Sequence, residues 1–111
     1  METEEVGLPS FDRREHFRGH CIADVEIERG SSLLRARTLN ISLGGMLLEM
    51  ENPLWVGAEF LARVSLEEGA PLELGCVVRQ VLPEVGVGVE FLDLKPAEQA
   101  RLQKLVQTLP H

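Results

Sequence analysis

The feature that most restricts the fold of this chain is a succession of short apolar runs separated by turn-forming residues. Six such runs lie at residues 21–28, 33–39, 46–50, 60–66, 72–82 and 85–91. Several of them alternate apolar and polar side chains, which is typical of strands with one face in water. Gly, Pro, Asn and Ser fill the breaks between the runs. Six short strands at this spacing predict a β-barrel or a β-sandwich.

The end of the chain has a different period. Pro96 suits the first position of a helix, and Pro110 suits the residue that stops one. Between them the apolar residues follow at spacings of three, one and three, namely Leu102, Leu105, Val106 and Leu109. This spacing predicts an amphipathic helix that packs over the barrel.

The length of 111 residues leaves room for one ordinary domain. A chain of this size buries enough surface to be stable without disulfides or a structural metal. We expect residues 11–111 to form that domain. Residues 1–10 lack apolar periodicity and carry three acids, so they are predicted to be a mobile acidic tail.

Charge and composition exclude several classes of function. Eighteen acidic against eleven basic residues give a net charge of −7, the wrong sign for binding duplex DNA or RNA. No apolar run is long enough to span a membrane, and the first residues are acidic, unlike a secretory signal. We therefore expect a cytoplasmic protein without membrane insertion.

The side chains most often used in catalysis do not form a recognisable set. Cys21 and Cys76 lie singly in apolar runs and are predicted to be small core residues. His16 and His20 are four residues apart, without the glutamate or the third ligand of a zinc site. Ser42 lacks the first glycine of a nucleophile elbow. The chain is predicted not to be an enzyme and to hold no metal.

Six residues outside the main pattern have ordinary structural interpretations. Trp55 is predicted to pack in the core or in a loop, with ligand stacking or partner docking as the alternative. The arginines Arg35, Arg37 and Arg79 alternate with apolar neighbours, which indicates a solvated barrel face, with a supplementary phosphate contact as the alternative. Gly86 and Gly88 lie on one face of the last strand and suit a bend or a close backbone approach.

An arginine cluster precedes the first strand. Arg13, Arg14 and Arg18 lie within six residues, and Arg14 and Arg18 are four apart. Guanidinium groups bind phosphate oxygens and the O6/N7 edge of guanine through paired hydrogen bonds. The alternative is a solvated surface on which Arg13 and Arg14 pair with Asp12 and Glu15.

A second polar cluster lies between the second and third predicted strands, at residues 40–45. Asn40 and Ser42 are followed by the paired glycines Gly44 and Gly45. Such residues form turns for local reasons, because Asn and Ser bond their own backbone and Gly adopts positive φ freely. They also suit a ligand, since alternate residues of an extended chain point the same way and glycine admits a flat ring. The order of residues alone does not decide between these interpretations.

Together the two clusters resemble a known family. The pattern Arg14-x-x-x-Arg18 before the first strand and Asn40-x-Ser42-x-x-Gly45 after the second is similar to that of the PilZ domain family. The resemblance runs from about Phe11 to Leu109 and includes the strand at 86–91 and the terminal helix. It implies a six-stranded antiparallel β-barrel with a C-terminal α-helix.

The resemblance also implies a function as a receptor for the second messenger cyclic di-GMP. Arg14 and Arg18 would bind its phosphates and guanine edges, and Arg13 would influence how many ligand molecules bind. Asn40, Ser42 and Gly45 would line the barrel surface that recognises a guanine. The family more often has Asp where this chain has Asn40, which removes charge assistance from that hydrogen bond.

The resemblance further implies that binding orders the N-terminal arginine segment and that the signal passes to another protein, whose identity the sequence does not give. The alternative function is that of a PilZ-like adaptor that binds a protein partner and no nucleotide. Relatives of that kind usually lack the arginine pair or the Asn/Ser/Gly loop, and this chain has both.

Overall fold

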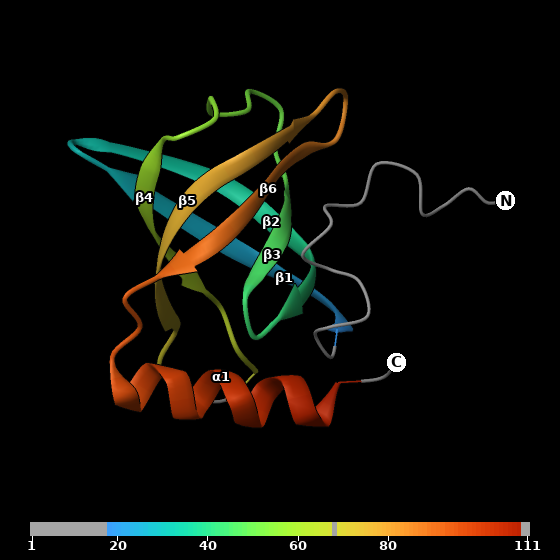
Figure 1. The fold of residues 1–111 in the computed structure, drawn as a ribbon, viewed down its shortest axis with the longest axis vertical. Coiled ribbons are helices and arrows are strands. Elements are labelled where there is room, and N and C mark those ends of the chain that lie inside the picture. Colours follow the sequence, from blue (N-terminus) through green and yellow to red (C-terminus); the bar gives the residue numbers. More distant parts are fainter. Residues whose placement is uncertain (1–17, 68, 110–111) are drawn as a thin grey trace, which may run out of the picture.

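The computed structural model describes residues 18–67 and 69–109, which form a closed six-stranded barrel and one helix (Figure 1). All neighbouring strands are antiparallel, and the order around the barrel is β1-β2-β3-β6-β5-β4. The elements are β1 (Arg18–Arg29), β2 (Ser32–Ser42), β3 (Gly45–Glu49), β4 (Glu59–Val64), β5 (Leu72–Leu82), β6 (Gly86–Leu92) and α1 (Pro96–Thr108). The predicted barrel with a C-terminal helix is confirmed, whereas the predicted acidic tail at residues 1–10 lies outside the described residues.

The segment between the second and third strands differs from its prediction as a six-residue loop. β2 continues through Ser42 and β3 begins at Gly45, so only Leu43 and Gly44 connect the two strands. Pairing with β1 keeps residues 40–42 extended, because their partners there are residues 18–20. The loop prediction was wrong at these positions since the extension of β1 to Arg18 was not evident from local sequence.

The barrel interior is filled by the apolar side chains that alternate along each strand. Ile27, Met46, Leu48 and Val89 are fully buried in one continuous core. Cys76 belongs to the same core, as predicted, and burial raises the pKa of its thiol, which keeps it protonated and unreactive. The side chain of Cys21 lies outside the described residues.

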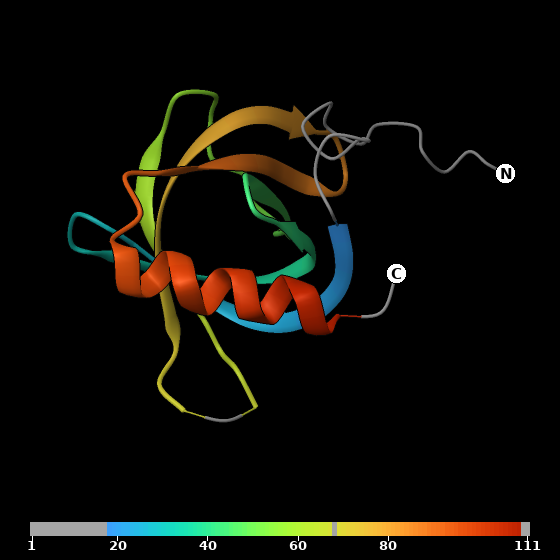
Figure 2. The ribbon, with the colours of Figure 1, turned by 60° about the horizontal axis from the view of Figure 1, so that its bottom comes forward.

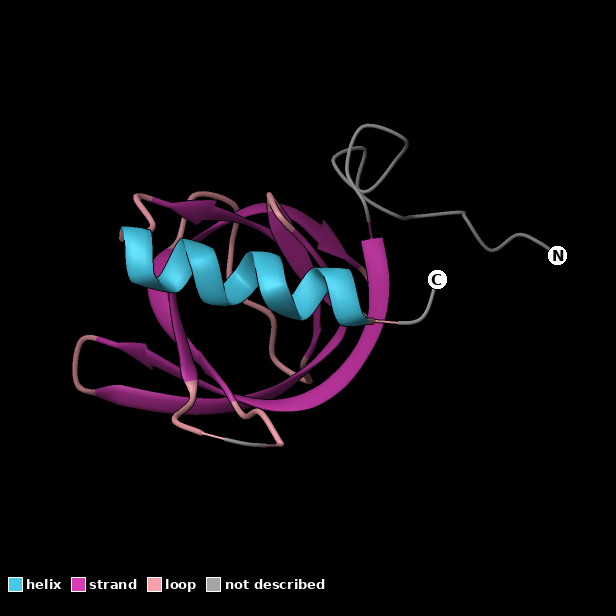
Figure 3. Cartoon of the chain, turned by 90° about the horizontal axis from the view of Figure 1, so that it is seen from below, coloured by secondary structure: helices cyan, strands magenta, loops and turns pink. Residues whose placement is uncertain are grey.

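Helix α1 lies across one open end of the barrel (Figures 2 and 3). Leu102 and Val106 face the core and are each 1% exposed, in agreement with the predicted apolar stripe. Arg101 donates hydrogen bonds to the carbonyl oxygens of Ala70 and Pro71, at 2.6 and 3.2 Å, and so ties the helix to the β4–β5 turn. Within the described residues, α1 is too short and too polar to cross a bilayer.

The outer face of the barrel is charged and exposed, as predicted for Arg35, Arg37 and Arg79. Arg37 pairs with Glu49 at 3.6 Å, and Arg79 pairs with Glu90 at 2.7 Å. Such pairs contribute little stability in water and mainly keep the face soluble.

The densest group of charges on this face surrounds Arg63 on β4. Its guanidinium contacts carboxylates of three strand residues, Glu26 at 3.4 Å, Glu28 at 2.6 Å and Glu73 at 3.1 Å. Hydrogen bonds to Glu28 and Glu73 raise the pKa of Arg63. The guanidinium therefore remains charged and links β1, β4 and β5 through these three carboxylates.

Trp55 does not join the core. It lies on the connection between β3 and β4 with 56% of its surface exposed, and the guanidinium of Arg29 stacks over its ring at 4.4 Å. The ring is therefore packed against the β1–β2 hairpin by a cation–π contact. The interpretation of Trp55 as a core residue was wrong, while that of loop packing holds.

The turn between β5 and β6 carries a strained residue. Val85 N–H donates to the carbonyl of Leu82 at 3.0 Å, and Glu84 has a φ of 67°. The left-handed region costs a non-glycine residue roughly 1–2 kcal/mol. Glu84→Gly is therefore expected to stabilise the fold by about 0.5–1 kcal/mol after the added flexibility of the unfolded chain is subtracted.

Urea unfolding of the full chain measures this difference. The control is Glu51→Gly, which replaces an exposed glutamate whose φ is not positive. This control is expected to leave the free energy of unfolding unchanged or to lower it. Equal effects of the two substitutions would show that Glu84 is not strained.

Candidate ligand site at the end of β2

Cross-strand pairing between β1 and β2 places part of the arginine cluster beside the Asn/Ser/Gly cluster. The backbone of Arg18 lies directly opposite Ser42, and that of His20 lies opposite Asn40. Residues paired in this way have Cα atoms about 4.5–5.5 Å apart. The two clusters are thus adjacent at this point, while Arg13 and Arg14 lie outside the described residues.

The Ser42 hydroxyl organises the turn into β3. Its Oγ accepts hydrogen bonds from the backbone N–H groups of Gly44 and Gly45, both at 3.3 Å, and donates to the carbonyl of Gly45 at 3.2 Å. The side chain is fully buried, with 0% exposure. The local role of Ser42 as a turn former is therefore realised, and its hydroxyl proton is already engaged.

Asn40 differs from Ser42 because its side-chain oxygen has no partner. Oδ1 is buried and accepts no hydrogen bond from any residue the structure describes, although the residue is only 8% exposed. Its backbone carbonyl accepts from Thr38 Oγ1 at 3.0 Å, at a shift of register between β2 and β3. An unsatisfied buried acceptor costs roughly 1–3 kcal/mol, so this oxygen is a candidate for contact with a ligand donor.

Two rows of residues extend from this point across the outer face of the barrel. One row runs from Asn40 through Leu47 and Gly88 to Gln80, according to the pairing of β2, β3, β6 and β5. The other begins at the Ser42 turn and runs through Gly45 and Glu90 to Val77. Both rows contain a glycine, Gly45 in one and Gly88 in the other, and both glycines are buried.

Leu47 and Gly88 belong to this surface and were missed by the sequence interpretation. Leu47 lies between the core residues Met46 and Leu48 and therefore points outward, yet it is only 5% exposed and does not belong to the core cluster. The available signal was the run of residues 46–48, in which apolar side chains follow one another without alternation. Such a run indicates a strand covered on both faces.

The chemistry of this surface is that of binding. It contains an amide oxygen without a hydrogen-bond partner among the described residues, the glycine backbone at Gly45 and Gly88 and, next to Gly45, the carboxylate of Glu90 bound to Arg79. Ser42, the hydroxyl residue of the cluster, is held by three backbone groups. Among residues 18–67 and 69–109, no group of three His, Cys, Asp or Glu side chains is placed to hold a metal ion.

Comparison with known proteins decides the family. The profile of the PilZ domain matches residues 12–108, which is most of the chain. The chain belongs to the PilZ domain family. The match to the family profile thus confirms the resemblance that the two motifs indicated. No curated protein sequence matched the chain.

Solved structures share the fold of this PilZ domain. The PilZ domain of YcgR from Escherichia coli, solved with c-di-GMP, aligns with a TM-score of 0.72 and 20% identity over 87% of this chain and 91% of that one. Bacillus subtilis MotI/DgrA, an inhibitor of motility, aligns with a TM-score of 0.70 and 23% identity over 86% of this chain. This PilZ domain covers 49% of MotI/DgrA.

A third similar structure is the PilZ domain of CeSA from a cellulose-synthesizing bacterium, with a TM-score of 0.69 and 21% identity. The alignment covers 85% of this chain and 98% of that domain. At these identities the three structures establish a common fold, and the ligand of this PilZ domain must be argued from its own residues.

Proposed function

We propose that this PilZ domain is a cytoplasmic receptor for cyclic di-GMP and that it has no catalytic activity of its own. The observation that carries the proposal is the unpartnered Oδ1 of Asn40, which lies opposite the first residues of β1 and beside the Ser42 turn. The ligand is the one with which the YcgR PilZ domain was solved.

In this proposal each motif residue has a distinct role. Arg14 and Arg18 bind the phosphates and guanine edges of the ligand, and Arg13 influences the number of ligand molecules bound. Asn40 accepts a hydrogen bond from a guanine N–H group, which would satisfy its buried oxygen. Ser42 and Gly45 act through the turn, where the serine holds the backbone and the glycine lets a base approach.

The expected affinity is in the micromolar range. Hydrogen bonds to charged groups contribute roughly 1.5–3 kcal/mol each, so about four of them from two arginines nominally reach the −8 kcal/mol of micromolar binding. Ordering and association oppose binding, and guanine stacking on the barrel surface offsets that cost. The net charge of −7 does not prevent this, because distant charges are screened beyond about 8 Å at physiological salt.

The signal is proposed to pass to another protein through ordering of the N-terminal arginine segment. Two structural neighbours are named for different outputs of their own, MotI/DgrA as an inhibitor of motility and MrkH as a c-di-GMP-dependent transcription regulatory factor. The competing function is an adaptor that binds a protein without nucleotide. Asn40 separates the two, because a buried acceptor without a partner among the described residues has a use in nucleotide binding and none in an adaptor.

Asn40→Leu tests this proposal. Leucine has nearly the shape of asparagine and removes the unpaired oxygen, so the free energy of unfolding of the ligand-free protein is expected to rise by about 1 kcal/mol. The same substitution removes the acceptor for guanine, so affinity for cyclic di-GMP is expected to fall about tenfold or more. Urea unfolding and titration calorimetry on the full chain measure the two effects.

Thr38→Val serves as the matched control, since it also replaces a buried polar residue of β2. Its hydroxyl donates to the carbonyl oxygens of Asn40 and Leu47, at 3.0 and 3.4 Å, so this substitution should lower stability. If Asn40→Leu destabilised the free protein and left nucleotide affinity intact, Asn40 would be a structural residue and the adaptor function would be favoured.

A further inference from the structure

A second surface of interest lies where β2 extends beyond the end of its neighbour β3. On one side β2 pairs with β1 as far as Ser32, but on the other side it pairs with β3 only from Arg37 to Ile41. After Glu49 the chain turns away from β2, and the N–H of Met50 donates to the carbonyl of Val85 at 3.1 Å. Within the described residues, the edge of β2 at positions 32–36 has no strand beside it.

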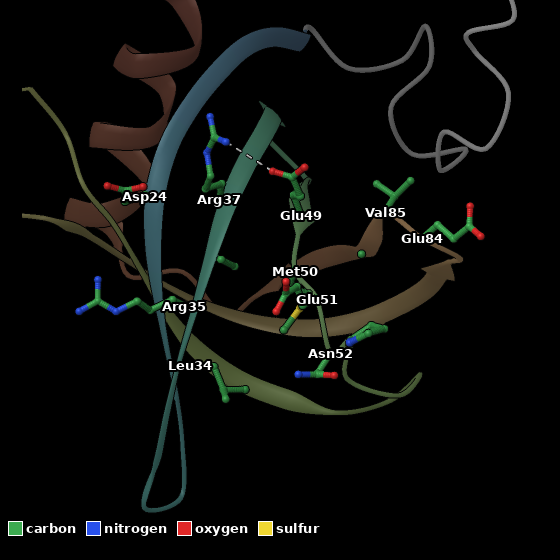
Figure 4. A pocket seen from close by; sticks show the side chains of 13 residues that line it. Asp24, Leu34, Arg35, Arg37, Glu49, Met50, Glu51, Asn52, Glu84 and Val85 are labelled. Atoms are coloured by element: carbon green, nitrogen blue, oxygen red, sulfur yellow. Dashed lines mark ion pairs between the residues drawn. The ribbon is translucent and has the colours of Figure 1, made fainter.

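The space beside this edge is an open groove with a volume of about 850 Å³ (Figure 4). Its apolar lining includes Leu34 and Val85, which are partly exposed, and Ala36 and Met50, which are only 7% and 8% exposed. The wall across from β2 consists of residues 51–53 and 84–86. An unpaired strand edge next to apolar side chains is the arrangement to which an extended peptide adds as a further strand.

The charged residues that line the groove indicate which kind of peptide would bind there. Arg37 is engaged by Glu49 at 3.6 Å, and Arg35 extends from β2 on the side away from Glu51 and Glu84 (Figure 4). Glu51 and Glu84 form no ion pair with any described residue. The wall facing β2 therefore presents two unneutralised carboxylates, which favour lysine or arginine on the occupant.

A second copy of this chain is disfavoured as the occupant, because two chains of net charge −7 repel one another.

We propose that this groove binds an extended segment of a partner protein in which apolar residues alternate with lysine or arginine. The backbone of the segment pairs with the β2 edge at residues 32–36. Its apolar side chains pack on Leu34, Ala36 and Met50, and its basic side chains pair with Glu51 and Glu84. The segment would span about 13–17 Å, the length of four to five strand residues. This inference is independent of the proposed nucleotide site.

The experiment uses the full chain and an acetylated, amidated Lys-Val-Lys-Val-Lys-Val peptide as the probe. Chemical shifts of the backbone amides at 33–36, 51–52 and 84–86 are expected to change in a saturable manner. The double variant Glu51→Gln and Glu84→Gln is expected to weaken binding about five- to tenfold. The matched control, Glu59→Gln with Glu67→Gln, removes the same charge outside the groove and is expected to change affinity less than twofold.

Two control peptides separate strand addition from simple charge attraction. A Glu-Val peptide of the same length, and a Lys-Val peptide with alternate backbone nitrogens methylated, are both expected to bind at least fivefold more weakly. Absence of shifts in the groove, or equal binding of either control peptide, would overturn the proposal. Cyclic di-GMP titration of the Glu51/Glu84 double variant tests the nucleotide site separately, so failure of one proposal is distinguishable from failure of the other.

Discussion

Replacing Arg18 by alanine is expected to lower the affinity for cyclic di-GMP about 100-fold or more without loss of fold. Arg18 begins β1 with its backbone opposite Ser42, at the edge of the proposed site. In the proposed complex its guanidinium makes two charge-assisted hydrogen bonds, worth roughly 3 kcal/mol or more together. Titration calorimetry measures the affinity, and a thermal melt of the free protein checks the fold.

Arg35→Ala is the matched control for this substitution. Arg35 is an exposed arginine of β2, and it lines the groove beside residues 51–53 and 84–86. Its removal changes the net charge equally but is expected to alter affinity less than threefold, since distant charges are screened. Equal losses for Arg18→Ala and Arg35→Ala would indicate general electrostatic attraction, and no loss for Arg18→Ala would remove Arg18 from the site.

Gly86→Ala is expected to have the largest effect on stability, a loss of roughly 3 kcal/mol or more. A Cβ at position 86 would overlap the carbonyl oxygen of Leu48 and lie within 3.0 Å of the backbone nitrogen of Met50. Both contacts are with backbone, so β3 and β6 would have to separate to admit the methyl group. The expected decrease in Tm is about 12–24 °C for a domain of this size, measurable by circular dichroism.

Gly30→Ala provides the comparison for Gly86. Gly30 also has positive φ, at 61°, but a Cβ there meets no atom within 4 Å. Alanine at this position has the energetic cost of a positive φ but no overlap with another atom. The free energy of unfolding is therefore expected to fall by only about 1–2 kcal/mol. If the two substitutions destabilised the protein equally, the close approach of Gly86 to Leu48 would not be a determinant of the fold.

Most of the fold was predictable because it follows from local periodicity. The alternation of β1 and the apolar stripe of α1 both point to the core that the structure shows. The close approach expected at Gly86 or Gly88 is confirmed at Gly86. What was not predictable depends on pairing between distant segments, such as the extension of β1 back to Arg18 and of β2 forward to Ser42.

The candidate site was predictable in composition more than in geometry. The motif identified Asn40, Ser42 and Gly45, and the barrel brings them together at one end of β2. The difference between the engaged hydroxyl of Ser42 and the unpartnered oxygen of Asn40 depends on the turn into β3 and on the shift in register after Thr38. Neither feature has a signature in the order of residues.

The central claim is that this PilZ domain binds cyclic di-GMP through the arginine segment and the Asn40–Gly45 surface. The most direct measurement is calorimetric titration of the full chain with cyclic di-GMP, repeated with the Arg14→Ala variant. The parent chain is expected to give saturable heat with a micromolar Kd, and the variant little or no heat. No heat from the parent, or equal heat from both proteins, would contradict the account.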